Sequence, residues 1–490
     1  MSSKTIWAIG DLHSDVHCAR HWIMRTGLIA NLTYESGEWQ PRELWHWKDK
    51  ESELVFMGDY IDKGPSAKDT LALVRSVQER FPEHVTALLG NHELNLLLDR
   101  GKARGEPRYF DYTYGVAHPL QYMDWLPPRA HVSSSSGGGG GGGGGGSGSA
   151  GGGGGGGGHA DATTQAMDAI TTALQRAYDD DSYPKRRMVP DLEPSSASLL
   201  QLVEPASLRP LVSRELRRWQ AAYLRGVSPR SGFGEWLQNS ASLTHVSGGT
   251  LFVHGGLEPT LALAGGRLSS VDALRRLNAR WWNVSREAAA RVPHGATVEE
   301  AEAVEEAALA QWAHLSDASS LVEYRGLHAP GARGCERVRA LLQSLRLSRI
   351  AVGHTPGNSV RTACNGQLLA LDSALGRNFR KFGNMHCDPR PSAPAERACA
   401  QWDATAGGAA QCEGQIVRLE RTAVPDDAAA AATRPSEEGR PAGEGAAAEA
   451  RSAAPAELGG VADDGWRVLV LSAAAEDDAD GTAEGHKVEL

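Results

Sequence analysis

The sequence has no apolar run close to the roughly 20 residues that a helix needs to cross a membrane. It also has no excess of positive charge, since 60 acidic residues outnumber 50 basic ones and the net charge is −10. A basic surface for nucleic acid is therefore not expected. We expect neither a membrane nor a nucleic acid among the partners of this chain.

Paired cysteine motifs are absent as well. The six cysteines are scattered and form no Cys-x-x-Cys pair, and the first residues enter an apolar run without the features of a secretory signal. Reduced thiols in a cytoplasmic protein are the predicted state. The final KVEL resembles an endoplasmic-reticulum retrieval signal, but valine stands where an acidic residue is usual.

The first hundred residues alternate between two patterns. Apolar runs at 5–10, 53–58 and 84–90 predict strands, and the segments 16–30 and 66–81 predict helices. Strands that alternate with helices favour an α/β fold with a parallel sheet and right-handed crossovers. We assign residues 1–385 to one catalytic domain of this class.

Other segments differ from this pattern. Residues 100–240 read as a helical insertion or cap that contains a flexible glycine-rich loop at 137–158. Two short strands around Gly248 and Gly249 and a helical stretch at 268–346 follow. The extension 386–490 is predicted to be acidic and largely disordered, and "GWRVLVLS" within it reads as a final strand or as a short motif after a linker.

Five short polar motifs each follow an apolar run. They are GDLH (10–13), GDYIDKG (58–64), GNHE (90–93), VHGG (253–256) and GHT (353–355). A parallel sheet gathers the carboxyl ends of its strands along one edge, where ligands bind. The sequence therefore predicts that these motifs meet in space.

The motifs supply carboxylate, imidazole and amide groups, which suit Mn, Fe, Zn or Co better than calcium. Six ligands exceed the need of one catalytic ion, and two ions about 3.5–4 Å apart share a bridging group. Asp59, which lies between the other motifs, is our choice of bridge. The predicted ligands are Asp11, His13, Asp59, Asn91, His254 and His354.

His92 follows Asn91 directly and is placed to act as a general acid toward a leaving oxygen. A histidine in that role benefits from a carboxylate that determines which ring nitrogen carries the proton. Asp62, three residues after Asp59, is the candidate for this partner.

The ordered set of motifs resembles the calcineurin-like metallophosphoesterase superfamily, and within it the phosphoprotein phosphatases, especially the Shewanella-like branch. The resemblance covers roughly residues 4–385 outside the glycine-rich insertion. It implies a β-sandwich core with βαβ units flanked by helices. It also implies one metal held by Asp11, His13 and Asp59, a second held by Asp59, Asn91, His254 and His354, and an acid pair of His92 and Asp62.

Two positions depart from the family pattern. Ser14 stands where glycine is usual, and Lys63 stands where an arginine that contacts the phosphate is usual. Lysine keeps the charge but lacks the planar fork of arginine. By resemblance Arg325 is the second phosphate-contacting arginine and becomes the main fork, and Asn91 also contacts the phosphate.

The predicted function is a metal-dependent protein phosphatase, which hydrolyses phosphomonoesters of proteins or peptides by attack of a di-metal-activated hydroxide. Preference for phosphoserine and phosphothreonine or for phosphotyrosine stays open. One alternative is hydrolysis of small phosphodiesters or dinucleoside polyphosphates. Another is a phosphate-binding scaffold without turnover.

Overall fold

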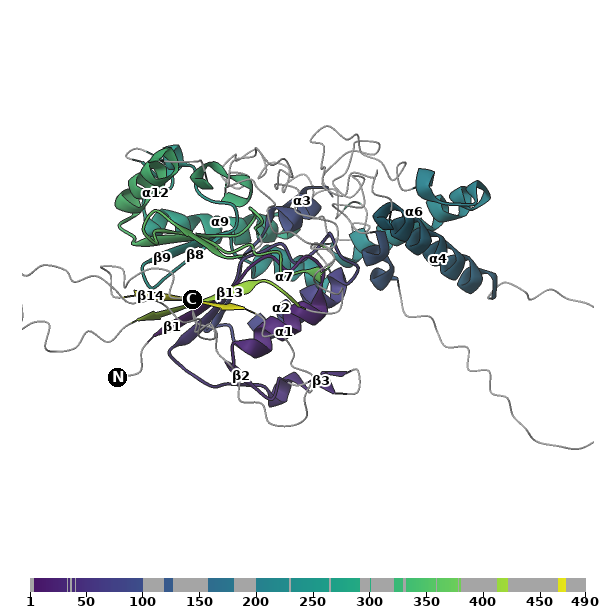
Figure 1. Cartoon of the computed structure of the whole chain (residues 1–490), viewed down its shortest axis with the longest axis horizontal. Helices are drawn as coiled ribbons and strands as arrows, with labels where there is room; N and C mark the ends of the chain where they lie inside the picture. Colours follow the sequence, from purple (N-terminus) through teal and green to yellow (C-terminus); the bar gives the residue numbers. More distant parts are fainter. Residues whose placement is uncertain are drawn as a thin grey trace, which may run out of the picture.

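The computed structural model of the chain describes residues 4–99, 119–126, 157–179, 200–290, 321–379, 412–421 and 466–472, apart from short gaps within these ranges. Two five-stranded sheets face each other at its centre (Figure 1). The first has the order β14-β13-β1-β6-β7, and the second has the order β11-β12-β10-β9-β8. The predicted β-sandwich core is confirmed.

The strands of the first sheet are β1 (Thr5–Ile9), β6 (Ser52–Phe56), β7 (Val85–Ala87), β13 (Gln415–Arg421) and β14 (Trp466–Ser472). Those of the second are β8 (Thr244–Ser247), β9 (Thr250–Val253), β10 (Arg349–Val352), β11 (Arg361–Ala363) and β12 (Leu368–Ala370). β1, β6 and β7 run parallel, as do β9, β10 and β12.

β1 shows why the first apolar run of the sequence is continuous. Ile6 and Ala8 point into the core between the sheets, while Trp7 and Ile9 point to the helical side. Strands covered on both faces need apolar side chains at every position, which explains the continuous run in the sequence.

Helices cover the outer faces of the sandwich (Figure 1). α1 (Val16–Arg25) and α2 (Ala67–Arg80) pack on the first sheet, and α9 (Val271–Ala290) and α12 (Ala332–Leu345) pack on the second. The first helix was predicted to reach residue 30. That prediction is wrong, because Gly27 takes a φ of 66° just after the helix end, a conformation that stops helices.

The described parts of residues 100–240 are helical. They comprise η3 (Pro119–Trp125), α4 (Gly157–Asp179), η4 (Ala206–Leu208), α6 (Arg209–Gly226) and α7 (Gly232–Asn239). α4 and α6 lie together at one end of the molecule, away from the sheets (Figure 1). The glycine-rich tract lies outside the described residues up to 156, and its last two glycines begin α4.

Two strands come from the segment that we assigned to the C-terminal extension. β13 pairs with β1 in antiparallel register, and β14 pairs with β13. The predicted strand in "GWRVLVLS" is confirmed as β14, and both strands complete the sheet that carries the first motif. The core thus continues beyond residue 385, and the rest of the extension lies outside the described residues.

The prediction of reduced cysteines is wrong for four of the six. Cys18 is bonded to Cys412, and Cys335 is bonded to Cys364. The first pair is 394 residues apart and meets only because β13 returns to β1 beside α1, so spacing in the sequence could not reveal it. Cys387 and Cys399 lie outside the described residues. Across the described ranges, no helix has the length and apolarity required to span a membrane.

Glu53 on β6 connects the two sheets. Its carboxylate lies 3.3 Å from Nε2 of His245 on β8 and 2.6 Å from Nζ of Lys4. Burial alone would raise the pKa of the Glu53 carboxyl, but the hydrogen bonds of His245, Lys4 and Ser247 outweigh it and lower the pKa to about 2.

We expect Glu53→Gln to lower the free energy of unfolding at pH 7 by about 1 kcal/mol, because the pair is partly exposed. The folded pKa lies below the unfolded value of about 4.3, so the stabilisation is present above that pH and is lost as the pH falls toward 2. Urea unfolding from pH 7 to pH 3.5 measures the effect, with exposed Glu51→Gln as control. A difference from wild type that stays constant over this range would contradict it.

Candidate active site

The five motifs converge at the carboxyl ends of β1, β6, β7, β9 and β10, as predicted. The site backbone is strained: the φ angles of His13, Asp59, Asp62, Lys63 and His354 are 44°, 54°, 65°, 58° and 61°. Each non-glycine residue in this left-handed region costs about 1–2 kcal/mol. Strain of this kind concentrates where a fold must aim side chains at a common point.

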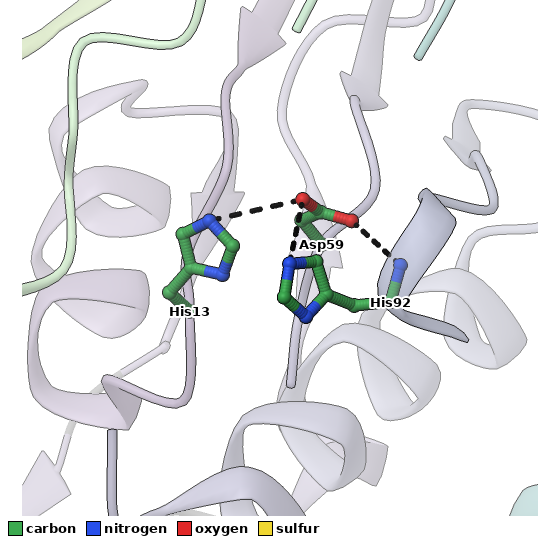
Figure 2. A group of neighbouring side chains, drawn as sticks. All are labelled: His13, Asp59 and His92. Carbon is green, nitrogen blue, oxygen red and sulfur yellow. Dashed lines mark hydrogen bonds and ion pairs between the residues drawn. The ribbon is translucent and has the colours of Figure 1, made fainter. Parts of the chain in front are cut away.

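Asp59 lies at the centre of the convergent side chains. Its Oδ2 is 3.7 Å from His13 Nε2 and 3.7 Å from His92 Nε2, and its Oδ1 is 3.2 Å from His254 Nε2 (Figure 2 shows the first two). Two groups with metal-ligand spacing share this carboxylate: His13, Asp59 and His92, and Asp59, His254 and His354. Asp59 therefore has the geometry of a bridge.

Asn91 and Asp11 complete the predicted set. The Asn91 Oδ1 lies 2.8 Å from His354 Nδ1 and 3.2 Å from His254 Nε2, so it belongs to the second group. Asp11 is fully buried, and its Oδ2 accepts a hydrogen bond of 3.0 Å from the His354 backbone N–H. Its Oδ1 is buried and makes no hydrogen bond. A buried carboxylate oxygen without a hydrogen-bond donor fits the role of a metal ligand.

Charge and hydrogen bonding prepare these groups for a cation. Burial would raise the pKa of Asp59, yet the surrounding imidazoles, His254 first, hold it well below its usual value. Burial and the nearby carboxylates raise the pKa of Asp11. His13 Nδ1 and His254 Nδ1 lie 3.2 Å and 2.7 Å from the carbonyls of Ile61 and Met57. Donation to a carbonyl through Nδ1 leaves Nε2 as the ligand atom.

The donor set of carboxylates, imidazoles and one amide thus fits two borderline first-row ions. The structure brings all six predicted ligands together, and His92 lies beside the first group.

His92 and Asp62 form a close pair. His92 Nδ1 lies 2.7 Å from Asp62 Oδ2, and both side chains are buried. The His92 backbone N–H also donates to Asp59 Oδ1 at 3.2 Å, so the same carboxylate anchors the start of α3 (Asn91–Asp99) (Figure 2). The structure places the pair where the sequence predicted it.

Residues 4–156 match the family model of the calcineurin-like phosphoesterases, and this range contains the first three motifs. This match assigns residues 4–156 to a calcineurin-like phosphoesterase domain. The match supports a metal-dependent hydrolase of phosphate esters, in agreement with the shared Asp59.

Solved structures give weaker likenesses. A cold-active protein-tyrosine phosphatase of a psychrophilic Shewanella species is 14% identical, with a TM-score of 0.37 over 86% of this chain and 78% of that one. A protein serine/threonine phosphatase from Saccharomyces cerevisiae, with similarity to human phosphatase PP5, is 11% identical, with a TM-score of 0.37 over 97% of this chain and 81% of that one. At these TM-scores neither structure supports a conclusion about the substrate of this chain.

Lys63 is buried beside the first ligand group of the phosphoesterase domain. Its Nζ lies 3.0 Å from His13 Nε2 and 4.3 Å from the centre of the Phe379 ring, and only 7% of the residue is exposed. Burial lowers the pKa of Lys63, while Asp59, Asp372 and Asp11 raise it. It is therefore no solvated surface lysine, but a buried amine that contacts one of the predicted metal ligands.

Arg325 reaches the same region from the segment before η5 (Gly326–His328). Its Nη1 donates to the His354 carbonyl at 2.8 Å and to Thr355 Oγ1 at 3.3 Å. Burial lowers the pKa of Arg325, and Asp372, Asp59 and Asp11 raise it. These contacts tie the guanidinium to the loop that carries His354.

Glu93 is the main site residue to which the sequence reasoning gave no role. Its carboxylate is fully buried and accepts backbone N–H bonds from Asp59 (2.9 Å), Tyr60 (2.8 Å), Ile61 (3.2 Å) and Gly90 (2.9 Å). Burial raises the pKa of this carboxyl to about 7. Glu93 joins the second motif to the third, and the fourth letter of GNHE was the signal that could have found it.

The segment after β12 was also missed. Asp372 follows a buried strand as the other motif residues do, and it is itself buried next to Asp11 and Lys63. Arg377 then donates three hydrogen bonds to Asp15: its backbone N–H and Nε to Oδ2, both at 2.8 Å, and Nη2 to Oδ1 at 2.9 Å. The Arg377–Asp15 pair therefore connects the segment after β12 to the loop that carries His13.

Proposed function

We propose that this chain is a metal-dependent protein phosphatase that hydrolyses phosphomonoesters on proteins or peptides. The observation that carries the proposal is the pair of histidine-carboxylate groups that share Asp59, next to the hydrogen-bonded pair His92–Asp62. The motif order also favours membership of the Shewanella-like branch.

In this proposal Asp11, His13 and Asp59 hold one ion, and Asp59, Asn91, His254 and His354 hold the other. Ions of this kind, Mn, Fe, Zn or Co, lower the pKa of a water molecule and stabilise charge on phosphoryl oxygens. The Nδ1 atoms of His13 and His254 lie beside backbone carbonyls, which leaves their Nε2 atoms as the ligand atoms.

His92 supplies the proton for the leaving group. A carboxylate accepts hydrogen bonds and donates none, so His92 Nδ1 donates to Asp62 and Nε2 is the atom that faces the site. Nε2 lies 3.7 Å from Asp59 Oδ2, beside the shared carboxylate. A proton on Nε2 is therefore in reach of an oxygen that departs from a phosphate held there.

Lys63, Arg325 and Asn91 are the proposed phosphate contacts. Lys63 and Arg325 place two cations from separate segments around the same carboxylates. Arg325 provides the forked donor and Lys63 a compact charge.

We expect Lys63→Arg to lower KM for a phosphopeptide by about three- to ten-fold, because a second charge-assisted hydrogen bond is added. kcat should change little, since the leaving group is protonated elsewhere. Steady-state kinetics measure both constants, and Lys68→Arg on α2 is the matched control. An unchanged KM at full metal content would count against a phosphate contact for Lys63.

The substrate is tested most directly with matched phosphoserine, phosphothreonine and phosphotyrosine peptides in defined Mn, Fe, Zn or Co. The same assay should include bis(p-nitrophenyl) phosphate and a dinucleoside polyphosphate as alternative substrates. Turnover of the peptides supports the proposal and decides their order. Turnover of only the diester or polyphosphate would replace it by the second function. Tight binding of phosphopeptide without release of phosphate would replace it by a scaffold.

The cytoplasmic location stays a prediction. It depended partly on reduced cysteines, and disulfides are rare in the cytosol.

A further inference from the structure

Gln121 is a fully buried glutamine that contacts both the backbone and the side chain of Asp62. Its Nε2 donates to Asp62 Oδ1 at 2.7 Å, and its Oε1 accepts the Asp62 backbone N–H at 3.0 Å. Ser14 Oγ donates to the same Oε1 at 3.4 Å. The partners determine the amide orientation, since the carboxylate accepts and the backbone N–H donates.

These bonds divide the Asp62 carboxylate between two partners. Oδ2 faces His92 Nδ1 and Oδ1 faces Gln121, so neither oxygen is left to rotate toward another donor. Asp62 also has the unfavourable φ of 65°, which neighbouring contacts must maintain. Gln121 therefore restrains both the backbone and the side chain of Asp62, and Asp62 in turn orients the ring of His92.

We propose that Gln121 is a positioning residue for the His92–Asp62 pair. Through it the helical segment, which comprises η3, α4, α6 and α7, controls the orientation of His92. The inference rests on the proposed function, because it assigns Gln121 an effect on proton donation by His92.

The helical segment reaches the site through η3. The Tyr122 ring is 5.2 Å from that of Tyr223 on α6, and the Trp125 ring is 5.3 Å from Tyr223 and 5.2 Å from Phe233. Gly226 allows this approach, since a Cβ there would lie 2.0 Å from Trp125 Cε3. A displacement of α6 would thus move η3, and Gln121 would carry that movement to Asp62.

The test compares Gln121→Met with Gln238→Met. Gln238 is equally buried and donates to the Gly234 carbonyl at 2.9 Å on α7, so this control also loses a buried hydrogen bond. For Gln121→Met we expect kcat to fall about ten-fold or more on a phosphoserine peptide and much less on p-nitrophenyl phosphate, whose leaving group needs no proton. Metal content and KM should stay at wild-type values, and Gln238→Met should show no dependence on the leaving group.

Two further measurements separate positioning from a general loss of structure. In a His92→Ala background Gln121→Met should have no additional effect on kcat, because the group it positions is gone. In zinc-loaded protein with labelled histidine, the NMR resonance of His92 Nδ1–H should shift or broaden in Gln121→Met but not in Gln238→Met.

An undiminished effect in the His92→Ala background would overturn the inference, as would equal losses on both substrates or an unchanged His92 resonance. These results would leave the phosphatase proposal standing if the wild-type enzyme is active. An inactive wild type with full metal content would instead refute the proposed function, while the NMR comparison would still report on the contact.

Discussion

Asp59→Asn should reduce the bound metal from two ions per chain to one or fewer. Both ligand groups contain Asp59, and an asparagine amide offers one neutral oxygen in place of two charged ones. Substitution of a residue that only hydrogen-bonds a metal ligand lowers metal affinity about 10–100-fold. Loss of a carboxylate that both ligand groups share should therefore lower it further. Metal analysis after exhaustive dialysis gives the stoichiometry directly, without an activity assay.

The fold should survive this change. An asparagine oxygen can still accept the His92 backbone N–H that Asp59 Oδ1 now accepts at 3.2 Å. Asp272→Asn on α9, where the side chain is 73% exposed, is the matched control and should keep both ions. Two full-occupancy ions in the Asp59 variant would refute the bridging role.

His92→Ala should retain both metals and lose about 10²–10⁴-fold in kcat on a phosphoserine peptide, the usual contribution of a general acid. The loss on p-nitrophenyl phosphate should be far smaller, since nitrophenolate leaves without a proton. The structural reason is that Nδ1 is occupied by Asp62 at 2.7 Å, which leaves Nε2 to face the reacting phosphate.

A plot of log kcat against the pKa of the leaving group measures this effect. It should be steeper for the variant than for wild type. His84→Ala is the matched control, because His84 is half-buried just before β7, at the opposite end of that strand from Asn91. Equal losses on both substrates, or a fall in metal content, would show that His92 acts as a ligand or support instead.

Residues that directly follow apolar runs were predictable. Asp11, Asp59 and His254 each come after a strand, and parallel strands bring their carboxyl ends to one edge of a sheet. Asp372 carries the same signal after β12 and was missed only because no motif marks it. Gln121 carries no signal, since it follows no strand and lies in a short helical turn inside a long insertion.

The sequence by itself determined the α/β alternation, the convergence of the six side chains predicted as ligands and the pairing of His92 with Asp62. These follow from local periodicity and from the chemistry of short motifs, both of which are written within a few residues. The tertiary structure alone decided the Cys18–Cys412 disulfide, the addition of β13 and β14 to the first sheet, and the contact of Gln121 with Asp62. Each of these contacts joins segments that lie between 45 and 415 residues apart in the sequence. Loop closure costs little extra for long connections, and a contact of this kind leaves no local pattern in the sequence.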